Sequence, residues 1–273
     1  MMTSYAFEAT NVVLTDKEFQ ELSKQVYDLT GIVLKLEKKS MVHSRLSRRL
    51  KELNLFKYSD YISYLNGPKR EQEIPHLITA ITTNLTKFFR ENHHFDYLKD
   101  VVFPSLQNHG RIRIWSAGCS TGEEPYSLGM TIKEYMGHHA YNLKILATDI
   151  DPQVVAHAQA GIYQKTEGIP TPYRSKYCIS HGQGVTIQPE VKNLITFKQL
   201  NLLDTWPMKG PFEIIFCRNT VIYFDKPTQQ KLFKKMAALM PVGGWLFIGH
   251  SENLYNVCDQ FKLVGQTIYQ RVE

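Results

Sequence analysis

Two adjacent carboxylates stand in a glycine-rich segment of this sequence. Residues 115–126 read WSAGCSTGEEPY, so that Gly118 and Gly122 precede Glu123 and Glu124. A loop built for phosphate carries a lysine in the pattern G-x-x-x-x-G-K-[ST], and a dinucleotide site has the spacing G-x-G-x-x-G. Neither pattern is present, and the two acids would repel a pyrophosphate. The segment favours a nucleoside ligand with positive charge, and S-adenosylmethionine, which has a sulfonium and an ammonium group, is the obvious candidate.

Further polar residues follow other strand-like runs. Asp149 follows residues 143–148, Asn201 and Leu202 follow residues 197–200, and Arg218 and Asn219 follow residues 212–217. Ligands of open parallel sheets sit beyond the carboxyl ends of the strands, so we expect these residues to meet at one edge, where Gly118 lets the backbone approach a ligand closely. Asp149 is placed to accept hydrogen bonds from both ribose hydroxyls. The alternative for any one of these loops is a strand-end turn with solvated acids.

The elements that must position these residues alternate after about residue 105. Strand-like runs at 111–116, 143–148, 212–217 and 245–249 lie between or beside helical segments at 126–136, 152–159 and 228–240. This rhythm predicts an α/β domain whose parallel sheet is covered by helices on both faces. Residues 262–271 could form one or two antiparallel edge strands, and residues 177–197 a small hairpin or excursion.

The first 80 or so residues have helical periodicity instead. Thr15 and Glu18 have the spacing of a capping box, and Gly31 is a natural helix stop. Further helices are expected over the basic segment 35–51, over 58–65 and over 71–83.

The net charge of +6 is concentrated in one place. Residues 35–51, KLEKKSMVHSRLSRRLK, carry seven Lys or Arg against one Glu. We expect Met41 or Val42, Leu46, Leu50 and Leu53 to form the buried stripe of this helix, and His43, Arg45, Arg48 and Arg49 to be turned away from it. The basic face could be merely solvated, could bind a nucleic-acid backbone, or could dock onto an acidic protein helix.

Composition predicts an ordinary globular protein of the cytoplasm. The chain has 273 residues, 43% of them hydrophobic, but no apolar run of the ~18 residues that a membrane span needs, and MMTSYAFEATNVV lacks the pattern of a signal peptide. The four scattered cysteines are expected to be reduced thiols. The His93–His94 pair has no further ligands at suitable spacing, so we expect no metal and assign the pair to helix capping and packing.

Five segments of the chain closely resemble the CheR family of chemotaxis receptor methyltransferases. They are TTNLTKFFRENHHF at 82–95, SAGCSTGEEPYS at 116–127, ATDID at 147–151, FCRNTVIYFD at 216–225 and GHSEN at 249–253. The resemblance implies a Rossmann-like S-adenosylmethionine-dependent methyltransferase domain with a small all-α N-terminal domain and a small β-subdomain insertion. The implied domains are residues 1–80 for receptor recognition, 81–105 as a linker with cofactor contacts, and 106–273 for cofactor binding, with the β-subdomain at about 175–197.

The same resemblance implies an activity and a set of site residues. The family transfers a methyl group from S-adenosylmethionine to glutamate side chains of receptors, giving glutamyl methyl esters and S-adenosylhomocysteine. Carried onto this sequence, it places Asn84, Thr86 and Arg90 against the cofactor and reacting centre, Glu124 at the methionine or ribose, Asp149 at the ribose, Asn201 and Leu202 at the adenine, and Arg218 and Asn219 at the end of the fourth strand. Arg90 and Tyr223 are the candidate catalytic residues, with a core aromatic as the alternative for Tyr223.

The implied partner is the glutamate-rich cytoplasmic helical domain of methyl-accepting chemotaxis proteins, contacted by Arg45, Arg48 and Arg49. The turn at residues 181–184 is shorter than in family members that bind a C-terminal receptor peptide, so we expect no need for that tether. We expect a monomer without nucleic acid or membrane insertion. Two alternatives stay open, a non-catalytic S-adenosylmethionine-binding signalling module and a basic nucleic-acid methyltransferase.

Overall fold

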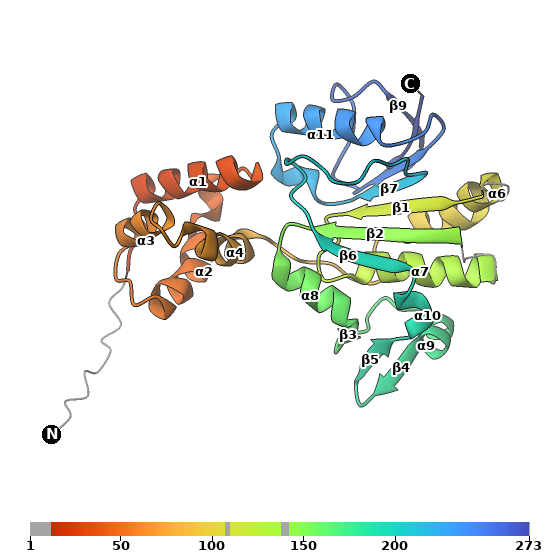
Figure 1. The fold of residues 1–273 in the computed structure, drawn as a ribbon, viewed down its shortest axis with the longest axis horizontal. Coiled ribbons are helices and arrows are strands. Elements are labelled where there is room, and N and C mark those ends of the chain that lie inside the picture. The colour runs from red at the N-terminus through yellow and green to blue at the C-terminus, as the bar shows by residue number, and fades with distance from the viewer. Residues whose placement is uncertain (1–11, 107–109, 138–141, 273) are drawn as a thin grey trace. The chain divides into compact units, whose positions relative to one another are not determined.

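The chain folds into two compact units that meet in sequence at Thr82 and Thr83 (Figure 1). The computed structural model describes residues 12–106, 110–137 and 142–272. The N-terminal stretch in which we expected no signal peptide lies largely outside these residues. In the described part, no helix is both long and apolar enough to cross a membrane.

The first unit is a bundle of short helices around its own core. Its elements are α1 (Asp16–Thr30), the 3-10 turn η1 (Leu36–Lys38), α2 (Lys39–Glu52), α3 (Tyr58–Leu65) and α4 (Arg70–Ile81). The predicted capping box begins α1, because the Thr15 hydroxyl accepts the Glu18 N–H while the Glu18 carboxylate accepts the Thr15 N–H. Gly31 ends the helix with φ of 70°, a left-handed conformation that suits glycine.

Helix α2 buries Val42, Leu46 and Leu50 as expected, but its basic face is not uniformly exposed. The Arg49 side chain is only 18% exposed and forms an ion pair of 2.6 Å with Glu73 of α4, which is buried. Arg45 donates to the carbonyls of Ala80 and Thr82, and His43 contacts the Tyr58 hydroxyl.

The prediction that all four basic side chains turn away from the core was therefore wrong for Arg49 and His43, and Arg45 is also half-buried against its own unit. Glu73, on another helix, is buried and needs a cation beside it, and Arg49 supplies that charge. Arg48 is 87% exposed and stays on the surface.

The second unit is built on a seven-stranded sheet in the order β6-β2-β1-β7-β8-β10-β9. Its strands are β1 (Ile112–Ala117), β2 (Leu143–Asp149), β6 (Ile195–Gln199), β7 (Ile214–Cys217), β8 (Trp245–Ile248), β9 (Phe261–Gly265) and β10 (Ile268–Arg271). The first five strands are parallel, and β10 and β9 add an antiparallel edge, as residues 262–271 suggested.

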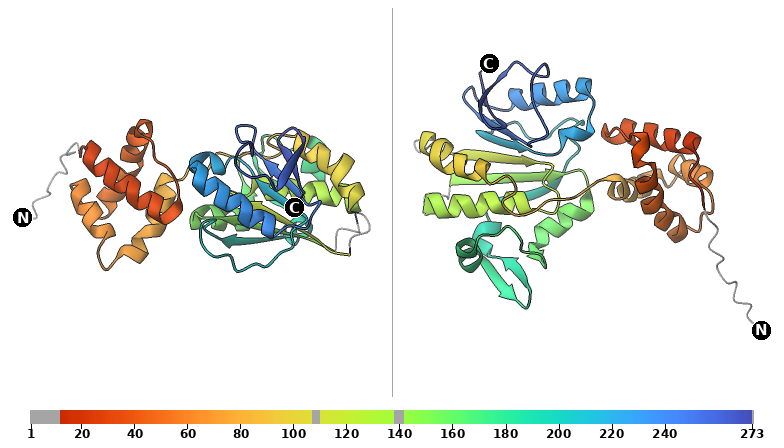
Figure 2. Two further views of the ribbon diagram at one scale, coloured as in Figure 1. Left: turned by 90° about the horizontal axis from the view of Figure 1, so that it is seen from above. Right: turned by 180° about the vertical axis from the view of Figure 1, so that it is seen from behind.

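Helices cover both faces of this sheet, as predicted (Figure 1 and the right view of Figure 2). The helices are α5 (His93–Tyr97), the π-helical turn η2 (Leu98–Val102), α6 (Phe103–Ser105), α7 (Glu123–Met136), α8 (Pro152–Ala160) and α11 (Lys226–Ala238). Alternate residues of β1 point to the two faces: Ile112 and Ile114 pack with α5 and α7, whereas Trp115 and Ala117 pack with α11.

A second, three-stranded sheet has the order β3-β5-β4 and packs outside α7 (Figure 1). Its elements are β3 (Ile162–Tyr163), α9 (Thr171–Tyr177), β4 (Cys178–His181), β5 (Gly184–Ile187) and α10 (Pro189–Lys192), and β4 and β5 form the expected hairpin around residues 181–184. The excursion differs from the expected span of about 175–197 in two respects. Residues 162–163 join it by pairing with β5, and residues 195–197 leave it because they pair in parallel with β2.

The strand order reverses between β1 and β7. From β1 the chain adds β2 and β6 on one side and then crosses to β7 on the other. The carboxyl ends of β1 and β7 diverge at such a point and form the usual ligand position of a doubly wound sheet. The predicted residues Gly118, Glu124 and Arg218 all follow these two strands.

Candidate active site

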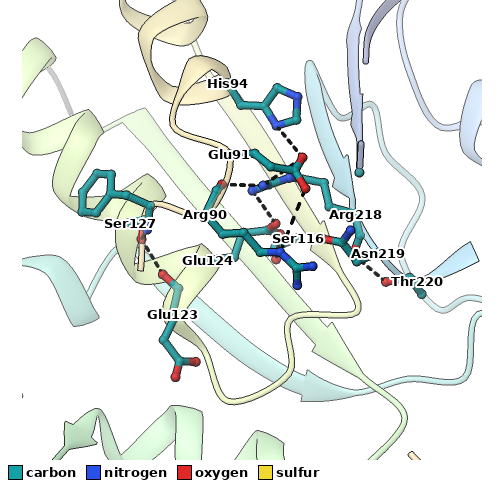
Figure 3. Close-up of polar contacts among 12 residues, drawn as sticks. Arg90, Glu91, His94, Ser116, Glu123, Glu124, Ser127, Arg218, Asn219 and Thr220 are labelled. Carbon is teal, nitrogen blue, oxygen red and sulfur yellow. Dashed lines mark hydrogen bonds and ion pairs between the residues drawn. The ribbon is translucent and has the colours of Figure 1, made fainter. Parts of the chain in front are cut away.

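Arg218, the first residue after β7, holds three groups together (Figure 3). Its guanidinium is 3.2 Å from Glu124 Oε2 and 3.2 Å from Glu91 Oε2, and it also donates to the carbonyl of Arg90. The side chain is 2% exposed, so all three contacts are shielded from water. Charge-assisted bonds of this kind orient their partners strongly. Arg218 therefore joins β7 to the start of α7 and to the segment that precedes α5.

Glu124 lies between Arg218 and Ser116, which is near the carboxyl end of β1. The Ser116 hydroxyl donates to its Oε1 at 2.7 Å, while Arg218 binds its Oε2. Burial raises the pKa of the Glu124 carboxyl, and the Arg218 guanidinium opposes this shift. The carboxyl is therefore fixed in position with one ion-pair partner, rather than solvated as in the alternative interpretation.

The segment Phe89–Glu91 has an unusual backbone. Phe89 has φ of 50° and Glu91 has φ of 57°, so both residues flanking Arg90 are left-handed without being glycine. Such conformations persist where surrounding contacts enforce them. Here the Phe89 N–H donates to Ser127 Oγ of α7 at 2.9 Å, and Arg218 binds the Arg90 carbonyl.

The Arg90 side chain is more exposed than that of Arg218 and has fewer polar contacts. It is 28% exposed, donates to the Leu85 carbonyl at 3.0 Å and has its Nε 4.0 Å from Glu91 Oε1. Arg90 is thus a cation at the site that retains access to solvent or to a ligand.

Glu91 is the second carboxylate on Arg218, and sequence reasoning did not single it out. Its other oxygen lies 2.9 Å from His250 Nδ1, and His94 Nδ1 lies 3.8 Å from Oε2. Burial acts to raise the pKa of Glu91, but the Arg218 guanidinium and His250 lower it to about 2. His94 is fully buried, packs on Phe216 and Phe247, and contacts Thr267 Oγ1 at 2.9 Å.

A second group of predicted residues surrounds the end of β2. Asp149 accepts the N–H of Ser120 at 2.8 Å and of Asp151 at 3.0 Å, and burial raises its pKa. The Asn84 side-chain amide donates to the Asp151 carboxylate at 3.0 Å, and the backbone carbonyl of Asn84 accepts the Ser120 hydroxyl at 3.1 Å. Asn84 and Asp149 are therefore connected through the glycine-rich loop.

Gly118 makes a close approach to the loop after β7. Its φ is 82°, and a Cβ there would lie 2.3 Å from Thr220 Oγ1. Only glycine fits this position without a shift of Thr220, so the loops after β1 and β7 pack closely here, and the approach of Gly118 to a ligand stays a prediction.

The remaining predicted residues lie on separate loops. The Leu202 carbonyl, after β6, accepts the Trp206 indole N–H at 3.1 Å and Lys235 Nζ at 3.2 Å, while the Leu202 side chain is buried. Asn201 accepts the Leu203 N–H at 3.0 Å and bonds Asp204 at 3.2 Å, which shapes the turn. Tyr223 ends the 3-10 turn η4 (Val221–Tyr223) and is half-buried.

The structure thus connects some predicted residues and leaves others apart. Direct contacts join Arg90, Glu124 and Arg218, and a second chain of contacts joins Asn84 to Asp149. Thr86 is half-buried in the segment before Arg90, and Arg45, Arg48 and Arg49 belong to the helical unit. In the described ranges, no group of three or more His, Cys, Asp or Glu could hold a metal ion, and the four cysteines are free and buried, as predicted for thiols.

The doubly wound sheet and the buried acids beyond β1 and β2 define a Rossmann-like nucleoside-binding protein. Two family models match this chain: "CheR methyltransferase, SAM binding domain" over residues 84–270, and "CheR methyltransferase, all-alpha domain" over residues 17–82. The chain belongs to the CheR methyltransferase family and is an S-adenosylmethionine-dependent methyltransferase, as the resemblance implied.

Curated relatives match over nearly the whole length. The chain is 42% identical over 263 residues to "Chemotaxis protein methyltransferase 2" of Pseudomonas aeruginosa, covering 93% of each chain. It is 40% identical over 275 residues to "Chemotaxis protein methyltransferase" of Escherichia coli, covering 98% of this chain and 95% of the relative. Both units of the chain are therefore present in these relatives.

Proposed function

We propose that this protein transfers the methyl group of S-adenosylmethionine to glutamate side chains in the cytoplasmic helices of methyl-accepting chemotaxis proteins, giving glutamyl methyl esters and S-adenosylhomocysteine. The observation that carries this proposal is the contrast between the site's two arginines. Arg218 is buried and paired with two carboxylates, whereas Arg90 is partly exposed and has no carboxylate closer than 4.0 Å among the contacts of the described residues. Arg90 can therefore attract an incoming carboxylate.

The charges near the strand ends suit the cofactor. The carboxylates Glu91, Glu124, Asp149 and Asp151 outnumber the two guanidinium groups of Arg90 and Arg218 there. S-adenosylmethionine has one net positive charge, from a sulfonium and an ammonium against a carboxylate. In this proposal Glu124 and Arg218 hold its methionine portion, Asp149 its ribose, and Asn201 and Leu202 its adenine, with Asn84, Thr86, Gly118 and Asn219 beside it.

The chemistry needs alignment more than proton transfer. S-adenosylmethionine supplies an electrophilic methyl carbon, and the acceptor oxygen bonds to that carbon as the carbon–sulfur bond breaks and its electrons stay on sulfur. A glutamate of ordinary pKa, about 4.3, is already ionised near neutral pH. Arg90 orients the carboxylate, Tyr223 positions it, and exclusion of water from the site favours the loss of both charges.

Receptor docking is proposed for α2 of the helical unit. Arg48 is 87% exposed and is the most accessible of the three predicted contacts, whereas Arg45 and Arg49 bond to groups of their own unit. An acidic receptor helix would be attracted by this basic surface. The two-residue turn between β4 and β5 supports a methyltransferase that needs no receptor C-terminal tether. A receptor substrate of this kind implies that the protein acts in the cytoplasm, and we propose that it does so as a monomer.

The test is transfer of labelled methyl from S-adenosylmethionine to a purified receptor cytoplasmic fragment, followed by mild alkali to release label from esters as methanol. We expect alkali-labile label with the wild type, and a loss of about 100-fold or more with Arg90→Ala, because misplaced reactants cost rate steeply. Arg111→Ala, an exposed arginine before β1, is the matched control and should retain activity.

Two results would favour the other functions. Cofactor binding by calorimetry without transfer to any receptor fragment would favour a signalling module. Alkali-stable label on RNA or DNA, with binding that weakens steeply in salt, would favour a nucleic-acid methyltransferase.

A further inference from the structure

Glu252, in the loop after β8, is a buried carboxylate that makes none of the contacts of Arg218 or Asp149 in the candidate active site. It is 6% exposed, and its oxygens accept four backbone N–H groups. Oε2 binds Gly249 N at 2.6 Å and Asn219 N at 2.9 Å, and Oε1 binds Val221 N at 2.9 Å and Ile222 N at 3.3 Å. A buried carboxylate is stable only when it is well bonded, and here the backbone supplies the bonds.

Three of these four N–H groups belong to the loop between β7 and Tyr223. Asn219 is left-handed, with φ of 54°, and Val221 and Ile222 are the first two residues of η4, whose third residue is Tyr223. The first N–H groups of a helical turn have no partner within the turn. The Glu252 carboxylate therefore supplies the acceptors that this loop lacks.

The loop is also held from other sides. The Gln229 amide of α11 donates to the Val221 carbonyl at 2.9 Å and to the Phe224 carbonyl at 3.0 Å. Gly249 lies so close that a Cβ there would stand 2.4 Å from Asn219 Nδ2. The position of Tyr223 thus depends on contacts from α11 and from the loop after β8, in addition to the hydrogen bonds within its own turn.

We propose that Glu252 is a positioning residue for methyl transfer, which sets the place of Tyr223 by binding the backbone of Asn219 and η4. The inference rests on the proposed function, in which Tyr223 positions the acceptor. Glutamine is the informative replacement, because it keeps the shape of the side chain but replaces one acceptor oxygen with an NH₂ donor that faces backbone N–H groups. The glutamine NH₂ and the backbone N–H groups are both donors and repel each other. The side chain must therefore shift, and we expect η4 to shift with it.

The experiment is a double-mutant cycle of Glu252→Gln and Tyr223→Phe on the full chain, with a receptor fragment as acceptor. We expect Glu252→Gln to lower kcat about 10- to 100-fold, the scale expected for a small misplacement, with the Kd of S-adenosylmethionine changed less than kcat. In the Tyr223→Phe background the same substitution should cost less than about threefold, since residues that act as one unit are non-additive.

Additive losses across the cycle would overturn the inference, because a general loss of folded enzyme multiplies equally in both backgrounds. Glu190→Gln, at an exposed glutamate of α10, should leave both constants unchanged. If Glu252→Gln does not fold, Glu252→Asp takes its place in the cycle, because it keeps the charge but shortens the reach to η4. Failure of the wild type to methylate receptor would count against the proposed function, whereas an additive cycle in an active enzyme counts only against the role of Glu252.

Discussion

The contacts of Arg218 make it a structural centre of the site. One buried guanidinium binds Glu91 and the Arg90 carbonyl in the segment before α5, and Glu124 at the start of α7, so it joins two segments of the chain to the end of β7. A guanidinium can bond several acceptors in a fixed plane, whereas an ammonium is a point charge. The identity of the cation at this position therefore matters as much as its charge.

We predict that Arg218→Lys weakens S-adenosylmethionine binding by more than about tenfold and lowers the free energy of unfolding by about 2 kcal/mol, because part of a buried ion-pair network is lost. Calorimetry and urea unfolding measure the two effects. Arg111→Lys is the control, and an Arg218→Lys enzyme with wild-type affinity and stability would contradict this account.

The lowered pKa of His94 makes the stability of the fold depend on pH. Burial, helped by Arg218 and His93, lowers its pKa to about 3. The unfolded chain, with an ordinary pKa near 6.5, therefore binds a proton that the folded chain rejects between pH 6.5 and 3. Stability is fully present above pH 6.5 and falls as the pH drops through this window, by up to about 5 kcal/mol from this residue.

We predict that His94→Gln flattens the fall of stability between pH 6.5 and 4. All three tryptophans, Trp115, Trp206 and Trp245, lie in the α/β unit, so their fluorescence in urea reports on that unit alone. His157→Gln, an exposed histidine of the same unit, should keep the wild-type slope. An unchanged slope in His94→Gln would assign the acid sensitivity to other groups.

At the scale of elements, two neighbouring arginines of α2 have different roles: Arg49 forms a buried ion pair, and Arg48 lies on the surface. Arg49 neutralises Glu73, which also accepts the Tyr61 hydroxyl at 2.9 Å, while Arg48 is exposed one position earlier. Removing one partner of a buried pair is costly, whereas exposed charges contribute little to stability.

We predict that Arg49→Ala destabilises the helical unit by about 3 kcal/mol or more, and that Arg48→Ala changes stability by less than about 0.5 kcal/mol. Thermal melting followed by circular dichroism tests this difference. Arg48→Ala should instead raise the KM for receptor at low salt with kcat unchanged. Equal effects of the two substitutions on stability would refute the assignment.

At the scale of the whole molecule, each unit has its own core. One hydrophobic cluster of the described residues runs from Leu14 to Ile81, and the other two lie between Phe88 and Tyr269. The proposed cofactor residues from Asn84 to Asn219 all fall in the second unit.

We predict that residues 83–273 alone bind S-adenosylmethionine within about threefold of the full chain, because units with separate cores fold separately. The fragment should lose most receptor methylation, since the basic helix is missing. Calorimetry tests cofactor binding, and the labelled-methyl assay tests methylation. Wild-type methylation by the fragment would show that receptor docking does not need the helical unit.

The sequence by itself determined the elements and the edge of the sheet where the site lies. The Thr15–Glu18 capping box, Gly31 and the strand runs are local patterns, and parallel strands bring Gly118, Asp149 and Arg218 to one edge whatever the details. Local patterns do not state which distant groups become partners.

The tertiary structure alone decided the pairings of the charged residues. Arg49 pairs with Glu73 instead of lying on the predicted surface. Arg218 pairs with Glu91 and Glu124. Glu252 accepts the backbone N–H groups of the loop before Tyr223. These choices depend on burial, because a charge removed from water must find a partner within reach, and only the packed fold shows which partner that is.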